Sequence, residues 1–387
     1  MAGPQKNNLS LTNPVVLFAP LDWGLGHTTR CIPLIHYFLS LGCQVVAAVD
    51  EKQQAILEKE FTNLKFVSLK GYRLAYGRSG WQTLAKIILQ VPRIVATIYQ
   101  ENRWLKKFVQ STPVHAVISD NRYGLFSKKL PCIFVTHQLA IQTPFGAPAR
   151  WLVQKINYRF IQQFGACWVP DYKENANLAG KLSHPRQMPS VPVSYIGRLS
   201  RIAEPLPAGN PGSLLIVLSG PEPQRSIFEE IVFSQLDRLQ VPAVLVRGLP
   251  KAENAPPLLS KYVVVHNYLS APELAAEISR AETIVSRSGY STVMDITGRG
   301  KKCIFVPTPG QPEQIYLADY LQQKQLCICF RQNHFSLEKA LQLAKTGAFA
   351  PMDGLSSYIY KEELETFVSK LKKANGPIAG SVHSSVK

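Results

Sequence analysis

Short apolar runs alternate with longer amphipathic segments along the chain. The short runs are rich in Val and Ile and bounded by polar residues, which is typical of strands buried in a parallel sheet, and the longer segments repeat apolar residues at helical spacing. Predicted strands are 15–18, 44–49, 64–69, 114–119, 132–136, 166–169, 214–218, 241–246, 262–265, 283–285, 303–306 and 326–330. Predicted helices include 29–41, 53–61, 81–109, 149–164, 227–239 and 337–345. This alternation predicts an α/β protein built from doubly wound, Rossmann-like sheets.

A stretch rich in proline, glycine and serine, residues 183–212, interrupts this alternation near the middle of the chain. Such composition is typical of a linker. We therefore expect a first domain over 14–197, a linker over 198–212 and a second domain over 213–357. The amphipathic segment 358–373 predicts a terminal helix, and 374–387 predicts a disordered tail.

Composition agrees with two soluble domains. The chain has 387 residues, 46% of them hydrophobic and 18% charged, which suffices for a large core and argues against disorder. Its seven cysteines are odd in number and form no C-x-x-C pair, so neither a disulfide framework nor a zinc site is predicted and a reducing cytoplasm is favoured. The N-terminal residues resemble no secretory signal, and the most apolar later stretch, 84–99, is too short and too interrupted to span a bilayer.

The positive charge is concentrated in the first half. Residues 1–200 hold 23 Lys and Arg against 9 Asp and Glu, whereas residues 201–387 hold 20 against 17. Within 65–107 and 150–160, basic residues are interleaved with aromatic and aliphatic ones, a pattern typical of segments that lie on an anionic membrane. The alternative is that the apolar stripe is core and the basic face is solvated. Nucleic acid is disfavoured because its usual recognition motifs are missing.

The stretch 282–318 contains a strand, a small-residue turn, a helix start, a second strand and a Pro/Gly-rich loop. Gly289 can adopt positive φ and lets a ligand approach, while Ser291 or Thr292 lies where the helix would begin. Free amides at a helix start favour an anion by about 0.3–1 kcal/mol. Arg287 would add positive charge, and Asp295 would reach a sugar diol. An ordinary βαβ unit would explain the same spacing.

Three polar clusters follow strands of the first domain. Because the strands are expected to be parallel, their carboxyl ends lie on the same side of the sheet. The clusters are Gly24, Gly26 and His27; Asp120 and Tyr123; and His137 and Gln138. His27, with Asp22 nearby in sequence, is a candidate general base because imidazole titrates near neutral pH. Alternatively, His27 only hydrogen-bonds a phosphate or the backbone. Asp120 is a second candidate base, an orienting group for His27, or a solvated strand-end acid.

The glycines of the first loop also raise a dinucleotide-binding alternative. Gly24-x-Gly26 followed by Asp50 nearly matches the dinucleotide fingerprint. However, the first glycine comes several residues after the strand, and Thr29 replaces the third glycine. These two differences disfavour an NAD enzyme.

Taken together, these motifs resemble GT-B nucleotide-sugar glycosyltransferases, and most closely the MurG-like N-acetylglucosaminyltransferases. Ser286 to Gly289 match the family's donor signature, and Thr292 and Gln314 occupy matching positions, while Gly26-His27 matches its Gly-His loop. The chain differs at Asp295, Leu317 and Leu25, where the family has a ribose-binding Glu, an Asn and a second glycine.

The resemblance implies two Rossmann-like domains with a cleft between them, the GT-B fold. It implies a donor site made of Ser219, Gly220, Arg225, Tyr268, Leu269, Arg287, Ser288, Gly289, Tyr290, Ser291, Thr292, Asp295, Glu313 and Gln314. It implies an acceptor and phosphate loop region with Gly24, Gly26, Tyr123, His137 and Gln138. We expect His27 or Asp120 to be the catalytic base.

We therefore expect a hexosyltransferase that moves GlcNAc or another hexose from a UDP-sugar to a lipid-linked or glycan hydroxyl with inversion. The chain has no Asp-x-Asp triplet, so neither a metal nor a cofactor beyond the UDP-sugar co-substrate is expected. The expected location is the inner face of the cytoplasmic membrane. Two alternatives are a UDP-sugar 2-epimerase of the same fold and a non-catalytic, membrane-docked module that binds nucleotide sugars.

Overall fold

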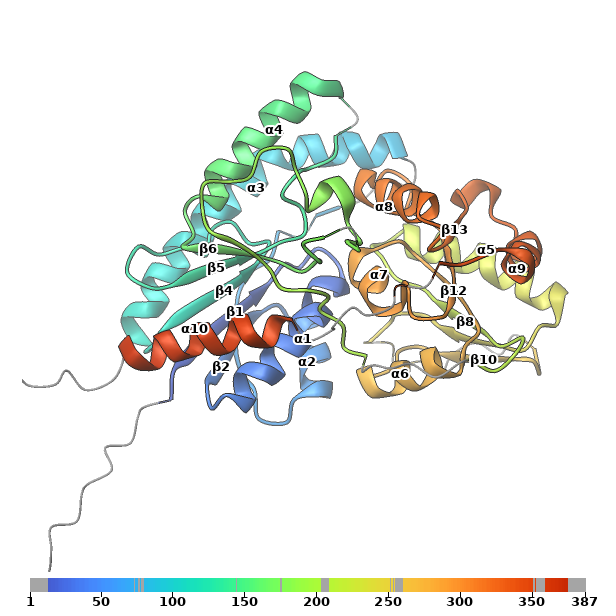
Figure 1. The fold of residues 1–387 in the computed structure, drawn as a ribbon, viewed down its shortest axis with the longest axis horizontal. Helices are drawn as coiled ribbons and strands as arrows, with labels where there is room; N and C mark the ends of the chain where they lie inside the picture. The colour runs from blue at the N-terminus through green and yellow to red at the C-terminus, as the bar shows by residue number, and fades with distance from the viewer. Residues whose placement is uncertain are drawn as a thin grey trace, which may run out of the picture.

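The computed structural model contains two parallel sheets, each with helices on both faces (Figure 1). It describes residues 13–374 except 73, 76, 78–79, 144, 175, 203–208, 251, 253, 255–259, 351 and 353–358. We call the part built on the first sheet the first domain and the part built on the second sheet the second domain. The predicted α/β class with two Rossmann-like sheets is confirmed.

The first domain has a seven-stranded sheet in the order β3-β2-β1-β4-β5-β6-β7 within the described residues. Its strands are β1 (Val15–Pro20), β2 (Gln44–Val49), β3 (Lys65–Ser68), β4 (Ala116–Asp120), β5 (Cys132–Val135), β6 (Ala166–Val169) and β7 (Val193–Tyr195). Its helices are α1 (Leu25–Ser40), α2 (Glu51–Glu60), α3 (Gly80–Ser111), α4 (Gly146–Ile161) and the short η1 (Gly180–Leu182).

The second domain has a six-stranded sheet in the order β10-β9-β8-β11-β12-β13, again within the described residues. Its strands are β8 (Leu214–Val217), β9 (Ala243–Val246), β10 (Val263–His266), β11 (Thr283–Ser286), β12 (Lys302–Phe305) and β13 (Ile328–Cys329). Its helices are α5 (Gln224–Leu239), α6 (Ala271–Arg280), α7 (Tyr290–Ile296), α8 (Pro312–Gln323), η2 (Gln332–His334) and α9 (Leu337–Thr346).

The central strands are apolar except near their ends because both of their faces are covered. In β1, Val16 and Phe18 belong to one buried cluster, and Leu17 belongs to the cluster on the opposite face. Successive side chains of a strand point to opposite faces, so a strand between two helical layers needs apolar residues at every position. The polar residues are therefore displaced to the strand ends, where the site is built.

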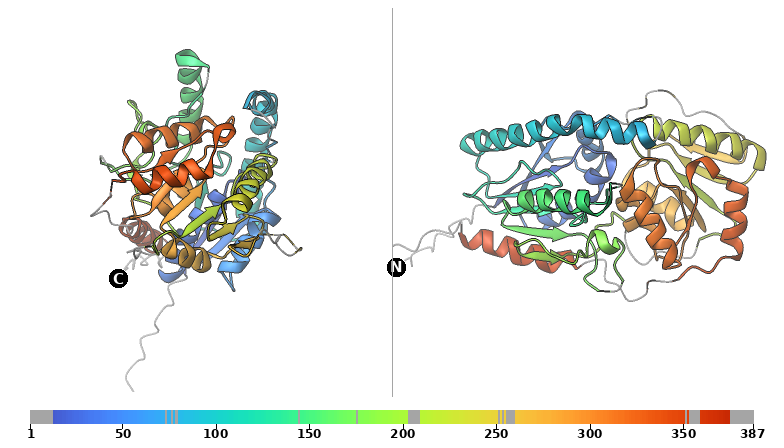
Figure 2. Two further views of the ribbon diagram at one scale, coloured as in Figure 1. Left: turned by 90° about the vertical axis from the view of Figure 1, so that its right-hand side faces the viewer. Right: turned by 90° about the horizontal axis from the view of Figure 1, so that it is seen from above.

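The last helix, α10 (Tyr360–Ala374), returns to the first domain (Figure 2). The ring of Tyr360 packs edge-on against Tyr37 of α1, and Lys372 Nζ donates to the carbonyl of Leu41 at 2.9 Å. Trp168 Nε1 of β6 donates to Glu363 at 3.2 Å. The predicted domain limits stay predictions, since linker residues 203–208 and tail residues 375–387 lie outside the described residues.

Two differences from the sequence prediction concern α1 and β7. α1 begins at Leu25 and not at residue 29, because Gly24 at φ 89° turns the chain directly into the helix. His27 therefore lies in the first helical turn. β7 lies inside the Pro-rich stretch 183–212; its three residues, close after Pro192, were too few to give a strand pattern.

Candidate functional site

The loops at the carboxyl ends of the two sheets touch each other directly. Ser291 Oγ, in the first turn of α7, donates to the carbonyl of Gly26 at 2.7 Å. Tyr290 Oη donates to the carbonyl of Pro170 at 2.7 Å. A Cβ at Gly26 would lie 2.9 Å from Ser291 Oγ, so this approach requires glycine or a shift of the serine. The predicted donor helix and the predicted first-domain loop are thus brought together.

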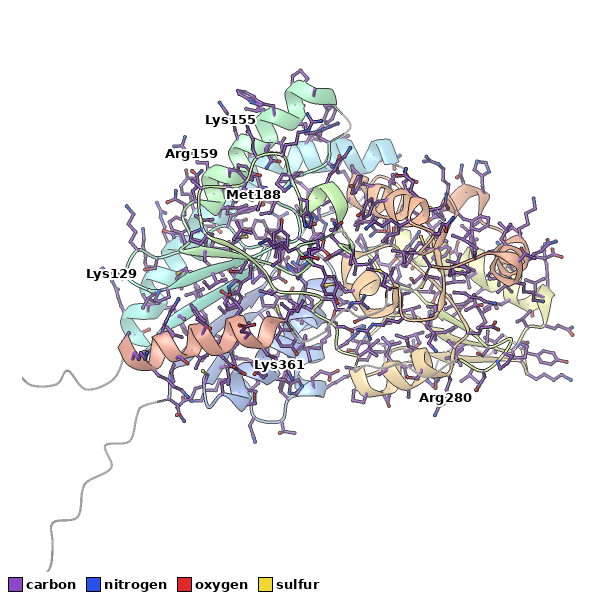
Figure 3. The ribbon with its side chains drawn as sticks, in the orientation of Figure 1. Lys129, Lys155, Arg159, Met188, Arg280 and Lys361 are labelled. Carbon is purple, nitrogen blue, oxygen red and sulfur yellow. The ribbon has the colours of Figure 1, made fainter. Side chains whose placement is uncertain are left out.

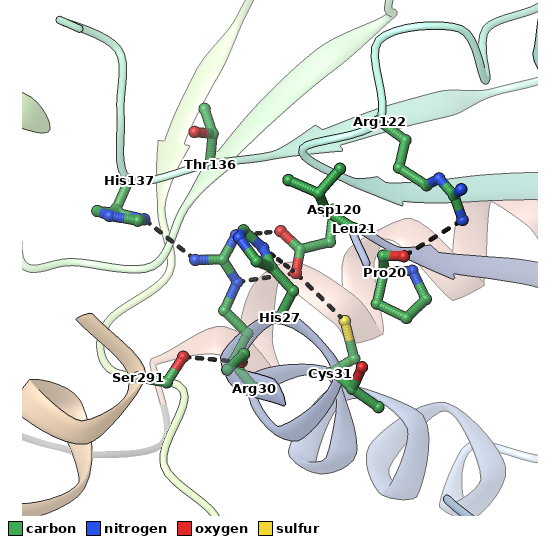
Figure 4. A network of polar contacts seen from close by, with 12 residues as sticks. Pro20, Leu21, His27, Arg30, Cys31, Asp120, Arg122, Thr136, His137 and Ser291 are labelled. Atoms are coloured by element: carbon green, nitrogen blue, oxygen red, sulfur yellow. Dashed lines mark hydrogen bonds and ion pairs between the residues drawn. The ribbon is translucent and has the colours of Figure 1, made fainter. Parts of the chain in front are cut away.

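His27 and Asp120 form a hydrogen-bonded pair at the edge of the first sheet (Figure 4). His27 Nδ1 lies 3.2 Å from Asp120 Oδ2, and the carboxyl group of Asp120 is buried while the imidazole side chain is 16% exposed. An ionised carboxylate only accepts hydrogen bonds, so Nδ1 carries a proton, and in the neutral imidazole Nε2 holds the lone pair. The carboxylate of Asp22, in contrast, accepts a hydrogen bond from the backbone of Tyr72 at 2.9 Å.

The environment of Asp120 favours an orienting role. Burial alone would raise the pKa of this carboxyl, but Arg30 and His27 beside it outweigh burial and bring the pKa down to about 2. A carboxylate with so low a pKa is a weak proton acceptor at neutral pH. Asp120 therefore fits the role of holding His27, and His27 fits the role of the base.

Arg30 binds both carboxylate oxygens of Asp120. It was not identified from the sequence. Its Nε donates to Asp120 Oδ2 at 2.8 Å, and its Nη2 donates to the other carboxylate oxygen. Its Nη1 lies 3.0 Å from His137 Nδ1. The side chain is 2% exposed. The sequence offered one clue to Arg30: it follows His27 by three residues, which places both in the same turn of a helix whose surrounding residues are buried.

His137 and Gln138 meet Glu313 of the second domain. His137 Nε2 lies 2.7 Å from Glu313 Oε1, and Gln138 Nε2 donates to the other carboxylate oxygen. The ring of His137 stacks on Tyr290 with centroids 4.0 Å apart. Burial, helped by Arg30 and His27, lowers the pKa of His137 although Glu313 acts in the opposite sense. Predicted residues of both domains therefore converge here.

Arg287 is buried, and its guanidinium points at protein oxygens. Nη1 donates to the carbonyls of Val306 and Pro307 at 3.1 and 3.3 Å. Nη2 donates to the carbonyl of Gln224 at 2.8 Å and to Gln332 Oε1 at 2.6 Å. Burial lowers the pKa of Arg287 to about 9. The side chain ties together the segments after β8, β12 and β13, while its predicted contact with a diphosphate stays a prediction.

The start of α7 leaves room above its backbone. Gly289 has φ −65°, so the positive φ allowed for in the sequence analysis is not used. A Cβ at Gly289 would meet only Gln314 Nε2, at 4.0 Å. Ser288 Oγ donates to the carbonyl of Gln314 at 2.8 Å, and Gln314 Oε1 accepts from the amide of Thr308 at 2.9 Å. The turn is held by these bonds, and the space over Gly289 is open.

Several other predicted donor residues already have protein partners. Asp295 accepts from Ser200 Oγ at 2.9 Å and from Arg201 Nε at 3.3 Å, so a ribose would have to replace these partners. Arg225 pairs with Glu222 at 2.6 Å and Glu229 at 3.2 Å.

The remaining predicted residues are distributed over both domains. Ser219 and Gly220 follow β8, with Gly220 at φ 107°, and Thr292 lies in the first turn of α7. Leu269 is buried, and Lys59 Nζ of α2 lies 4.5 Å from the ring centre of Tyr268. Tyr123 is packed into the first domain, since its ring stacks on Phe134 and its hydroxyl donates to Asn157 at 2.8 Å.

A cavity of about 450 Å³ opens in the first domain between the end of β3 and α3. Its lining includes Lys70, Gly71, Arg93 and Trp104. A Cβ at Gly71 would overlap the carboxylate of Asp22, so this cavity adjoins the loop that leads to His27. The cavity therefore lies next to Asp22, in the loop between β1 and α1.

The described residues hold neither a metal-binding cluster nor a membrane-spanning helix. Among the described residues, no cluster of three or more His, Cys, Asp or Glu side chains is arranged to hold a metal ion. No helix in the described part of the chain has the length and apolar character needed to cross a bilayer.

The Arg287→Met variant tests the role of this arginine in holding the loops. It would leave three buried carbonyls without their donor, so we expect the free energy of unfolding to fall by about 3 kcal/mol or more in urea titrations. The control is Arg280→Met on α6, whose ion pair with Glu277 is at the surface with the arginine 64% exposed; we expect it to change stability by less than about 1 kcal/mol. Equal effects of both variants would contradict this role.

Comparison with known proteins places this geometry in context. Residues 234–352 match the model of the glycosyltransferase family 28 C-terminal domain. Over 334 residues the chain is 23% identical to the UDP-N-acetylglucosamine--N-acetylmuramyl-(pentapeptide) pyrophosphoryl-undecaprenol N-acetylglucosamine transferase of Pasteurella multocida, covering 82% of this chain and 84% of the relative. The protein of the same name from Yersinia enterocolitica is 23% identical over 301 residues, which cover 75% of this chain and 77% of the relative.

Solved structures show the same fold. The glycotransferase of kitacinnamycin has a TM-score of 0.60 at 15% identity, covering 94% of this chain and 96% of that one. Arabidopsis thaliana UGT89C1 complexed with UDP-L-rhamnose has a TM-score of 0.58 at 12% identity, covering 94% and 97%. The predicted GT-B fold and the resemblance to MurG-like glycosyltransferases are confirmed. At the level of enzyme class, the matches support a glycosyltransferase.

Proposed function

We propose that this MurG-like protein of the GT-B fold transfers a hexose, GlcNAc foremost, from a UDP-sugar to a hydroxyl of a lipid-linked or glycan acceptor, with inversion. The proposal rests on the position of the His27–Asp120 pair next to the start of α7. The two are joined by the hydrogen bond from Ser291 of α7 to Gly26, the residue before His27. The names of the sequence relatives favour UDP-GlcNAc as the donor and a polyprenyl-linked sugar as the acceptor.

His27 would act as the general base. Its Nε2 takes the proton of the acceptor hydroxyl while that oxygen forms a bond to the anomeric carbon and the bond from that carbon to the UDP oxygen breaks. Asp120 stabilises the imidazolium that forms. Attack from the face opposite the leaving group inverts the anomeric centre.

The start of α7 would receive the diphosphate. Backbone amides between Ser288 and Thr292 lie next to the open space over Gly289 and would stabilise the charge that develops on leaving UDP. Because α7 has only seven residues, local amides matter more than the dipole of a long helix. No metal is assigned a part in this step, since the chain has no Asp-x-Asp triplet.

The same proposal includes contact with an anionic membrane, at the inner face of the cytoplasmic membrane. α3 and α4 expose apolar side chains, with Leu89 80% and Trp151 59% exposed. In the left view of Figure 2, α4 projects furthest from the body of the molecule, and α3 rises on the same side. The basic side chains of Lys155 and Arg159 extend outward from α4 (Figure 3). Apolar side chains bordered by basic ones fit the interface of an anionic bilayer, where a lipid-linked acceptor resides.

The Trp151→Ser, Leu152→Ser double variant tests membrane contact. We expect the protein to sediment with phosphatidylglycerol vesicles, and the variant to lose about tenfold or more in partitioning because each buried apolar side chain contributes about 1.5–3 kcal/mol. Val264→Ser is the control and should leave vesicle binding unchanged, because Val264 is 55% exposed but lies on the second domain, away from α3 and α4. Failure of the unaltered protein to bind these vesicles would remove the membrane from the proposal.

Transfer is tested by measuring UDP release from UDP-GlcNAc and other UDP-sugars with and without polyprenyl-diphosphate-linked sugars. We expect release that requires the acceptor and a product one hexose heavier. Release without acceptor that yields a free sugar epimer would indicate the epimerase instead. Binding of UDP-sugar with no release under any condition would indicate the non-catalytic module.

A further inference from the structure

A continuous line of polar contacts joins the candidate base to the second domain. It runs from His27 to Asp120, then to Arg30, then to His137, and ends at Glu313 in the first turn of α8. Figure 4 shows the first four of these residues with Arg30 between the others. The three central residues, Asp120, Arg30 and His137, are each at most 2% exposed.

The chemistry of Arg30 fixes the hydrogen positions along this line. A guanidinium has only donors, so His137 Nδ1 must accept from Arg30 Nη1. His137 Nε2 then carries the proton and donates to Glu313. On the other side, Asp120 receives two bonds from Arg30 and one from His27 Nδ1. With both histidines neutral, these contacts fix one tautomer for each ring.

Arg30 makes these contacts with one rigid, planar group. Three of its nitrogens are engaged, two by Asp120 and one by His137, so a rotation that breaks one bond disturbs the others. His137 is in turn fixed by Glu313 and by stacking on Tyr290, both of which belong to the second domain. If the second domain moved away, His137 would lose both of these partners.

We propose that Arg30 is a positioning residue that makes the orientation of His27 depend on Glu313, and hence on docking of the second domain. The proposal rests on the proposed function, in which His27 is the base and the second domain holds the donor. It has a chemical consequence: the lone pair of His27 Nε2 is directed at the acceptor when the donor domain is in place.

A double-mutant cycle tests this coupling. We expect Arg30→Lys to lower kcat about tenfold with less than about a threefold change in KM for UDP-GlcNAc, because a lysine cannot bond Asp120 and His137 in the same way. Glu313→Gln lowers kcat and also raises KM. In the double variant, kcat should be at least about fivefold higher than the product of the single effects predicts. Effects that simply multiply would overturn the proposal.

Glu273→Gln is the control for this cycle, and His137→Phe can take the place of Arg30→Lys. Glu273→Gln alters a glutamate in the first turn of α6, which bonds Ser270 and not the first domain, so its effect should multiply with that of Arg30→Lys. If Arg30→Lys does not fold, His137→Phe keeps a ring to stack on Tyr290 and removes both nitrogen contacts. With His137→Phe, Glu313→Gln should have little further effect on kcat; a full additional loss would overturn the proposal.

A spectroscopic measurement separates this proposal from the proposed function. The exchange rate of a ring N–H proton with water reports how firmly that ring is held, without any substrate. We expect the Nδ1–H proton of His27 to exchange slowly in the unaltered protein and faster in Glu313→Gln and Arg30→Lys, because the ring is then less firmly held although Asp120 still fixes its tautomer. Unchanged exchange of this proton in both variants would overturn the coupling, whether or not sugar transfer is observed. Lack of transfer with faster exchange would overturn only the function.

Discussion

Replacing His27 by alanine is expected to lower kcat for sugar transfer by about 10²–10⁴-fold, the usual contribution of a general base. The imidazole is held by Asp120 at 3.2 Å, and its second nitrogen is left with a lone pair. KM for the UDP-sugar should change little, because His27 is assigned to the acceptor side. Initial rates of UDP release at saturating donor and acceptor measure both quantities.

His334→Ala is the matched control for this prediction. His334 is an exposed histidine of η2 in the second domain, outside the His27–Asp120 pair. Its removal should leave kcat within about twofold, as expected for surface substitutions. Retention of more than a third of the activity by a folded His27→Ala protein would show that another group takes the proton.

Replacing Asp120 by asparagine is expected to have the second-largest effect, a fall in kcat of about 10²-fold. The amide has the size of the carboxyl group but not its charge, so it neither fixes the His27 tautomer nor stabilises the imidazolium. It also leaves Arg30 buried without its counter-charge, and breaking a buried ion pair costs about 3–5 kcal/mol. Urea titrations alongside kinetics separate the loss of stability from the loss of rate.

The pH dependence of stability provides an independent check on Asp120. Its pKa is about 2 in the folded protein and about 4 when unfolded, so its ionised form stabilises the fold by about 2.5 kcal/mol well above pH 4. This contribution is lost as the pH falls from about 4 toward 2. The stability difference between the unaltered protein and Asp120→Asn should therefore narrow over that range. A constant difference would contradict the assigned pKa.

The sequence was sufficient to predict the fold and to place the site at the carboxyl ends of the strands. Runs of Val and Ile mark buried parallel strands, and polar residues directly after them must lie at the carboxyl edge. His27, Asp120, His137 and Gln138 were found in this way, and the structure brings them together. The helix start at Ser291 and Thr292 was predicted from the strand, turn and helix pattern, and the family resemblance added Glu313 as a donor residue. Both meet the first domain at the same place.

Side-chain partners far apart in sequence were not predictable in this way. Arg30 is 90 residues from Asp120 and 107 from His137, so no local pattern marks it as their partner. Arg287 and Asp295 were assigned to the donor from their positions in the motif, yet both are directed at protein groups. The direction of a long or buried polar side chain depends on the nearest unsatisfied group, which tertiary packing decides.

The most direct test of the central claim is a crystal structure of the protein with UDP-GlcNAc or UDP. The account predicts diphosphate oxygens within hydrogen-bond distance of the amides between Ser288 and Thr292, with the sugar end of the ligand toward His27. A nucleotide bound at Gly24 and Asp50, in the manner of a dinucleotide and without contact to the start of α7, would contradict it.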